Sequence, residues 1–226
     1  MRPLIRAVAT LAATAFLVTA CGSGDWSAQP RPMPAPVGTL GPGFTDPTAP
    51  PTPEGTVRPR PGSWDGVHPP KGFRVVLVTT GDDAPTTALV AAVKSWAKEE
   101  RVDLRIVEAG SDLVPSITKA LDMGPDLVVT AGNDLVDPLA LVTASHLAQQ
   151  FLVVGAELAE PTHNVTAVDW AGASFRGEGL GMSSTYDAAS FTADRCAAAV
   201  RAGVAAVLSD LTGIVVWLDD GDGSAA

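Results

Sequence analysis

Two adjacent carboxylates, Asp82 and Asp83, stand between an apolar run and an amphipathic run of the sequence. Such a pair suits three kinds of chemistry: holding a divalent cation for phosphoryl transfer, accepting hydrogen bonds from ligand hydroxyl groups, or capping the helix that follows. A second polar loop, at residues 132–134, follows a later apolar run. The candidate ligand-binding residues are therefore Thr80, Asp82, Asp83, Asn133 and Asp134.

A phosphoryl-transfer site of the response-regulator receiver type does not fit the sequence. Such a site needs an aspartate at the end of the third strand, where this chain has Thr130, and a lysine at the end of the fifth, which is missing. The histidines and cysteines lack the spacing of metal ligands. Because no base, nucleophile or metal set stands out, we expect no enzymatic activity, no metal and no cofactor.

The elements that must position these residues lie between residues 71 and 220, where apolar runs alternate with helix-length amphipathic runs. We expect one Rossmann-like, three-layer α/β domain with a mainly parallel sheet. Its predicted strands are at residues 73–79, 104–107, 126–130, 151–154, 165–168 and 214–218. Its predicted helices are at residues 87–100, from 111 or 112 to 124, 137–149 and 193–208. Right-handed crossovers predict the strand order 2-1-3-4-5 plus a final strand.

This strand order brings the two polar loops together. In an open α/β sheet, ligands bind beyond the carboxyl ends of the strands, at the point where the strand order reverses. The first and third strands flank that point here, so the loop with Asp82 and Asp83 would face the loop with Asn133 and Asp134. The alternative is that both acids are solvated and stabilise only the N-terminus of the next helix.

The N-terminus has the features of a lipoprotein signal peptide over residues 1–20. Arg2 and Arg6 precede an apolar run of about a dozen residues, which is shorter than the about 20 that span a bilayer. The run ends in Val18-Thr19-Ala20-Cys21, which resembles a bacterial lipobox. This resemblance implies that Cys21 becomes the mature N-terminus and carries the lipid, such as palmitate. We therefore expect the chain on the extracytoplasmic face of the cell membrane.

The segment at residues 21–70 differs sharply in composition, because it holds thirteen of the nineteen prolines and little apolar content. We expect a disordered tether with a reach of roughly 40 Å. An acidic tail is expected at residues 221–226. Without the two signal-peptide arginines, 13 basic and 25 acidic residues remain, for a net charge of −12. That charge disfavours nucleic acid and anionic lipid as electrostatic partners, so the expected membrane link is the covalent lipid.

Four stretches of the sequence resemble the first lobe of the basic membrane protein family, the ABC-transporter substrate-binding lipoproteins that include purine nucleoside receptors. They read VVLVTTGDDAPTTALVAAVKSW, SDLVPSITKALDMGPDLVVTAGNDL, QFLVVGAEL and NVTAVDWAGASFRGEGLG, within residues 73–181. The resemblance implies the type-1 periplasmic binding-protein fold, a small polar ligand of nucleoside-like type and an ABC permease as partner.

The sequence also departs from that family. Only about 30 residues separate Gly181 from the last predicted strand, too few for a second lobe of about 100 residues. Thr86 and Thr87 stand where the family has ligand-stacking and amide residues, and Asn133 and Gly155 replace an aromatic and an acid. Of the residues that contact ligand in the family, only Asp83 carries over.

Two hypotheses from different functional classes remain. The first is a tethered solute-binding module, which would cover about half of its ligand unless a dimer supplies the second wall. The second is a structural or interaction lipoprotein that keeps the fold while its ligand site has degenerated. The acidic loops favour the first hypothesis, and the missing lobe favours the second.

Overall fold

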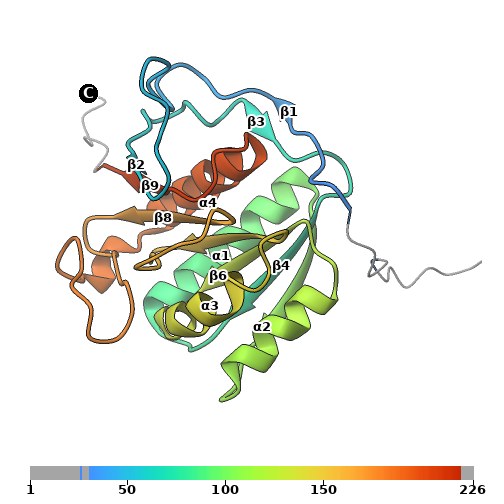
Figure 1. Ribbon diagram of the computed structural model, residues 1–226, viewed down its shortest axis with the longest axis vertical. Helices are drawn as coiled ribbons and strands as arrows, with labels where there is room; N and C mark the ends of the chain where they lie inside the picture. The colour runs from blue at the N-terminus through green and yellow to red at the C-terminus, as the bar shows by residue number, and fades with distance from the viewer. Residues whose placement is uncertain (1–25, 27–30, 220–226) are drawn as a thin grey trace, which may run out of the picture.

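The computed structural model describes Trp26 and residues 31–219. Its centre is a parallel sheet in the order β2-β9-β8-β7-β6-β4-β5 (Figure 1). The strands of this sheet are β2 (Thr56–Val57), β4 (Arg74–Thr79), β5 (Asp103–Glu108), β6 (Leu127–Ala131), β7 (Gln150–Val154), β8 (Val165–Trp170) and β9 (Val215–Leu218). The predicted signal peptide, Cys21 and the tail at residues 221–226 lie outside the described residues.

Helices cover both faces of the sheet, as the sequence predicts (Figure 1). One face carries α1 (Ala84–Glu100) and α4 (Ala193–Leu208), and the other carries α2 (Leu113–Asp122) and α3 (Val136–Thr143). A hydrophobic core lies on each face of the sheet, and alternate side chains of β4 point into the two cores. Val75 and Leu77 pack with α1 and α4, whereas Val76 and Val78 pack with α2 and α3. The α/β fold class and the strand order 2-1-3-4-5 plus a final strand are confirmed.

Two helix boundaries differ from the prediction by three residues or more. Helix α1 begins at Ala84 rather than at residue 87, because Asp83 provides its N-cap. Helix α3 ends at Thr143 rather than at residue 149. The side-chain amide of Asn164 donates hydrogen bonds of 2.9–3.2 Å to the carbonyl groups of Thr143, His146 and Gln149. Two of these carbonyl groups also accept turn bonds, from His146 N–H to Thr143 and from Gln149 N–H to His146, so Asn164 stabilises a series of turns after the helix ends.

The prediction of a disordered tether is wrong for residues 31–70. This segment forms β1 (Val37–Gly38), β2 and β3 (Val67–His68), and β2 pairs in parallel with β9 at the edge of the sheet. Phe44 is 1% exposed and Trp64 is 7% exposed, and both lie in the core that α1 and α4 cover. A few large apolar side chains thus fix a proline-rich segment that has almost no regular structure of its own.

The start of the described chain is also anchored. Trp26 is 7% exposed, and its indole N–H donates a 2.6 Å hydrogen bond to Asp103 at the start of β5. The Nε atom of Arg31 donates a 2.6 Å hydrogen bond to the Asp126 carboxylate just before β6. Both contacts lie at the amino ends of the strands, so the N-terminal segment is fixed to that edge of the sheet.

Candidate functional site

The two predicted polar loops meet at the carboxyl ends of β4 and β6, where the strand order reverses. Thr80 follows β4, and its backbone N–H donates a 3.3 Å hydrogen bond to Ala131, the last residue of β6. Gly132 has a φ of +118°, and a Cβ atom there would lie 2.6 Å from the carbonyl oxygen of Thr80. Only glycine permits this approach, so the close contact of the two loops depends on Gly132.

Asp83 caps helix α1. Its Oδ1 accepts a 3.0 Å hydrogen bond from the backbone N–H of Thr86, and its Oδ2 accepts a 2.8 Å bond from the Thr86 hydroxyl. A carboxylate has about four acceptor positions, so Asp83 keeps acceptor capacity toward solvent. The helix-capping role is therefore present in the structure, and it does not exhaust the side chain.

A cleft of about 210 Å³ lies between these loops. Four of the five predicted residues line it: Thr80, Asp83, Asn133 and Asp134. The fifth, Asp82, is exposed and does not contribute to the lining. Sites for drug-sized ligands usually measure about 300–1,000 Å³, so this cleft encloses a small ligand or one side of a larger one.

The opposite wall of the cleft comes from Tyr186 and Phe191, which sequence reasoning missed. Their ring centroids are 6.0 Å apart, and Phe191 also contacts Trp170 edge-on at 5.0 Å. Burial, and secondarily the charge of Asp83, raise the pKa of Tyr186. Both residues belong to the long connection between β8 and α4. The only signal for the first was that Tyr186 is the single tyrosine of the chain.

A buried polar cluster supports that connection beside the cleft. The Oδ1 of Asp169 accepts hydrogen bonds from the backbone N–H groups of Trp170 at 2.9 Å and Ser174 at 2.6 Å. Its Oδ2 is buried without a hydrogen-bond partner among the described residues. Burial raises the pKa of Asp169 to about 7, with a smaller contribution from the nearby charge of Glu157. The cluster holds the chain where it leaves β8, and sequence reasoning did not single it out.

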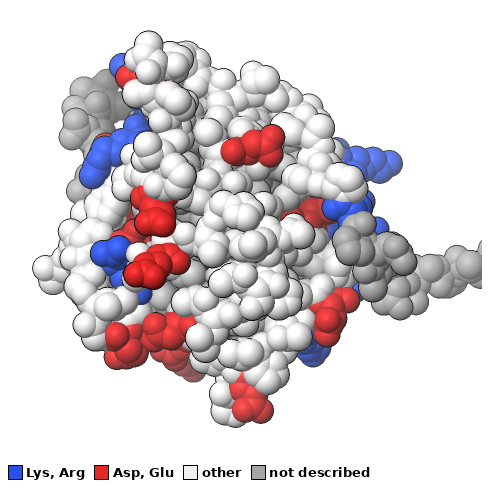
Figure 2. All heavy atoms as spheres, viewed as in Figure 1, with Lys and Arg blue, Asp and Glu red and all other residues white. Residues whose placement is uncertain are grey.

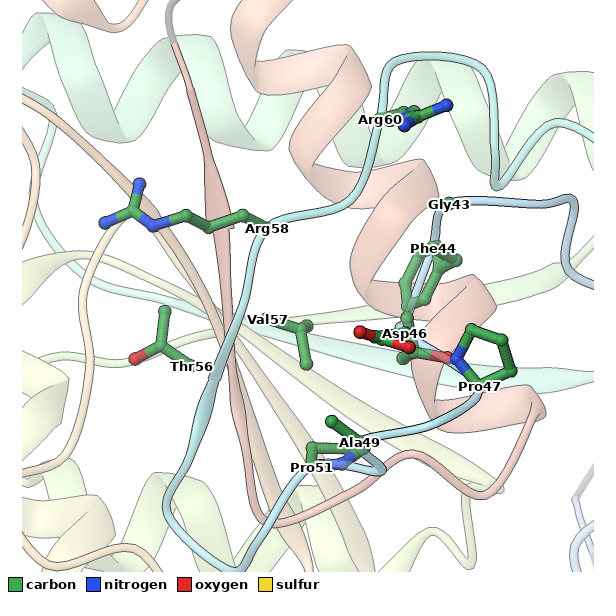
Figure 3. Close-up of a pocket in the computed structure, with 11 residues that line it drawn as sticks. Gly43, Phe44, Asp46, Pro47, Ala49, Pro51, Thr56, Val57, Arg58 and Arg60 are labelled. Atoms are coloured by element: carbon green, nitrogen blue, oxygen red, sulfur yellow. The ribbon is translucent and has the colours of Figure 1, made fainter.

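A larger hollow of about 550 Å³ lies beside the edge strand β2 (Figure 3). In Figure 3, Arg58 extends from one side of the β2 ribbon, whereas Val57 and Asp46 lie on the other. Arg58 pairs with Asp219, and Asp46 accepts hydrogen bonds of 2.7 and 2.8 Å from Thr48. Because Arg58 and Asp46 already have local partners, and because the hollow lies away from the switch point of the sheet, it is a weaker candidate than the cleft.

The described residues hold no group of three or more His, Cys, Asp or Glu side chains that could bind a metal ion. Cys196 is buried among apolar side chains, and burial raises the pKa of its thiol to about 11. The cleft itself offers carboxylate, amide and hydroxyl groups beside aromatic rings. That set suits recognition of a polar ligand through hydrogen bonds and ring contacts.

Comparison with solved structures finds only distant similarities to this chain. A lipoprotein fragment from Peptoclostridium difficile 630 has 21% identity and a TM-score of 0.39, over 42% of this chain and 84% of the fragment. ABC transporter solute-binding proteins from Aeropyrum pernix K1 and Conexibacter woesei DSM 14684 each have 21% identity, with TM-scores of 0.38 and 0.36.

The share of each chain covered differs among these structures. The match covers 44% of this chain and 29% of the Aeropyrum protein, and 43% of this chain and 35% of the Conexibacter protein. This chain thus spans about a third of those two proteins. No family model and no curated protein matches the sequence.

Proposed function

We propose that this chain is a non-enzymatic, extracytoplasmic lipoprotein whose α/β domain binds a small polar solute. Its lipid would be attached to Cys21, and its ligand would bind in the cleft between β4 and β6. The observation that carries the proposal is the meeting of Thr80, Asp83, Asn133 and Asp134 at the switch point of the sheet. The sequence resemblance to the basic membrane protein family supports a nucleoside-like ligand and an ABC permease as partner, for uptake or sensing.

The chemistry of the cleft defines the ligand class. The carboxylates of Asp83 and Asp134 are acceptors only, so they suit ligand hydroxyl or amino groups. Tyr186 and Phe191 offer ring faces to a flat or apolar part of the same ligand. Since the cleft holds about 210 Å³, a second wall from a dimer or a permease would complete the enclosure of a nucleoside-sized molecule.

A structural or interaction lipoprotein is the second candidate, and one observation favours it. Both oxygens of Asp83 already accept hydrogen bonds from Thr86, so the one residue that matches the family's ligand contacts also serves the fold. In that case the loops would keep their capping role without binding a solute.

Calorimetry separates these two functions. The chain with Cys21→Ser, which needs no lipid, is titrated with nucleosides, sugars and amino acids. We expect one class to bind, and Asp134→Asn to weaken that binding about 10- to 100-fold, the effect of losing a charge-assisted hydrogen bond of about 1.5–3 kcal/mol. Asp82→Asn is the matched control, because Asp82 lies outside the lining, and it should leave affinity unchanged.

Two outcomes of this experiment would contradict solute binding in the cleft. Absence of heat with all three ligand classes would favour the structural lipoprotein. Equal weakening by Asp82→Asn and Asp134→Asn would indicate a general electrostatic effect of the acidic loops instead of a site in the cleft.

The lipid attachment has its own test. The unmodified chain should stay in washed membranes of a bacterial host, and Cys21→Ser should move it to the soluble fraction. Retention of the Cys21→Ser chain after a high-salt wash would contradict attachment through Cys21.

A further inference from the structure

The N-terminal segment contacts the sheet from Trp26 onward, although its composition predicts a disordered tether up to residue 70. The indole of Trp26 is buried against β5, where it donates to Asp103 and lies 4.2 Å from the guanidinium of Arg105. Five residues later, Arg31 pairs with Asp126 and donates a 3.0 Å hydrogen bond to the carbonyl of Gly72. The first described residues are thus fastened at the amino edge of the sheet, by which we mean the starts of β4, β5 and β6.

This anchoring shortens the distance between lipid and fold. Trp26 is five residues after Cys21 in the sequence. A chain extends at most about 3.6 Å per residue, so the two Cα atoms are at most about 18 Å apart. A free coil of fifty residues would instead reach roughly 40 Å. A lipid on Cys21 would therefore keep the amino edge close to the bilayer surface.

The charges of the amino edge suit an anionic surface. Lys71, Lys98 and Arg101 are exposed there, and no ion pair engages them among the described residues. Two of the carboxylates nearby have partners, since Asp103 accepts from Trp26 and Asp126 pairs with Arg31, whereas Asp122 is exposed. The local field at this edge is thus more positive than the net charge of the whole chain indicates.

The carboxyl edge of the sheet has the opposite character. Exposed acids are frequent in its loops and helix starts, namely Asp82, Asp83, Asp134, Asp137, Glu178 and Asp187. Figure 2 shows several carboxylates at the left and lower left, on the side of the segment after β8, with a few basic side chains among them, and side chains of both charges at the right. An anionic membrane would attract the amino edge and repel the cleft edge.

We propose that the amino edge, marked by the exposed Lys71, Lys98 and Arg101, is a docking surface for the anionic lipid headgroups of the membrane that anchors the chain. The strands then run roughly perpendicular to the membrane surface. Strand β4, about 20 Å long, separates the cleft from the bilayer. This inference rests on the proposed attachment at Cys21. The cleft would open away from the membrane, toward solute or a partner protein.

Fluorescence quenching tests the orientation in the lipidated, full-length chain. Vesicles contain about 30% phosphatidylglycerol and a headgroup-attached nitroxide quencher. One variant carries a label at Asp122→Cys, at the end of α2 on the amino edge, and its matched partner carries the label at Asp187→Cys near the cleft. Each change removes one exposed acid, and the buried Cys196 stays unlabelled. We expect quenching at least threefold stronger for the Asp122 position, and equal quenching would overturn the proposal.

Vesicle sedimentation tests the surface without the lipid. The Cys21→Ser chain should bind weakly to vesicles with phosphatidylglycerol and not to vesicles of phosphatidylcholine alone. Each basic side chain near an anionic surface strengthens binding about fivefold, so Lys71→Gln with Lys98→Gln should weaken it about 25-fold. Arg58→Gln, which removes a charge at the distant β2 edge, should change it less than twofold. Equal loss with Arg58→Gln would contradict a defined surface.

The two tests distinguish failure of the membrane-docking proposal from failure of the proposed lipid attachment at Cys21. If the chain never enters membranes but the Cys21→Ser chain binds anionic vesicles as described, only the attachment at Cys21 is wrong. If a label at Asp122 is shielded in the soluble Cys21→Ser chain without vesicles, a second copy covers this edge and the membrane-docking proposal is wrong.

Discussion

Asp83 accepts two hydrogen bonds from a single residue, Thr86: one from its backbone N–H at 3.0 Å and one from its hydroxyl at 2.8 Å. This pair closes the first turn of α1 and places the carboxylate at the rim of the cleft. The same side chain therefore contributes to the fold and stands where a ligand would bind, so variants must be chosen to separate the two roles.

Helix capping predicts a graded loss of stability at this position. Asp83→Ala should lower the free energy of unfolding by about 0.5–2 kcal/mol, because the N–H of Thr86 loses its acceptor. Asp83→Asn should cost only a few tenths, since asparagine is as good an N-cap. Urea denaturation measures both, with Asp82→Ala as the control that should stay within about 0.5 kcal/mol. An equal loss for the two alanine variants would contradict the cap.

The N-terminal segment should contribute directly to stability through Phe44. Phe44→Ala removes a fully buried ring from the core and should lower the free energy of unfolding by about 3–5 kcal/mol. A nonspecific protease should then cleave within residues 31–70 before it attacks the sheet. Val37→Ala is the control, because Val37 is 57% exposed. If both variants resist protease equally, the segment does not depend on Phe44 for its attachment.

Asp169 predicts a stability that falls as pH rises. Its pKa is about 7 in the folded chain and 3.8 as the ordinary value, so between these values the folded state binds the additional proton. The contribution of Asp169 to the free energy of unfolding is fully present below about pH 4. It is lost as pH rises through 7, by at most about 1.4 kcal/mol per pH unit. Asp169→Asn should remove that slope in denaturation curves at pH 4.5, 6 and 7.5. A slope that persists unchanged in the variant would refute the assignment.

Gly203 should tolerate no side chain, because α4 lies directly on the sheet there. A Cβ atom would approach Leu152 and Val168 to 2.6 Å, and both are fully buried. Overpacking costs about 1–3 kcal/mol, and the better helix propensity of alanine returns up to about 1. Gly203→Ala should therefore destabilise the fold by up to about 2 kcal/mol in thermal unfolding. Gly110→Ala, where a Cβ meets nothing within 4 Å, should be neutral or slightly stabilising.

The sheet was predictable because parallel strands buried on both faces leave continuous apolar runs, as in Val75 to Val78. The meeting of Asp83 with Asn133 then follows from strand order alone. Residues 31–70 could not be predicted in this way. Phe44 and Trp64 stand isolated among prolines and glycines, and only the surface that they contact decides whether they are buried.

The aromatic side of the cleft shows the same limit. Tyr186 and Phe191 follow a long irregular connection without periodicity, so their positions depend on contacts such as the 2.9 Å hydrogen bond from Trp170 to Ser190. The end of α3 depends likewise on Asn164, which is distant in sequence from the carbonyl groups to which it donates. Local patterns identify elements, whereas these features arise from tertiary contacts.

The pairing of β2 with β9 joins residues about 160 positions apart, Thr56 with Val215. Ribosomes make the N-terminal partner first, so β2 must wait until nearly all of the described chain has been synthesised before its neighbour exists. Contacts between such distant segments form slowly, and meanwhile the edge of the sheet is unpaired. The proline-rich composition of residues 31–70 suits this order of events. A segment that forms no strand by itself avoids non-native strand pairing while the rest of the sheet assembles.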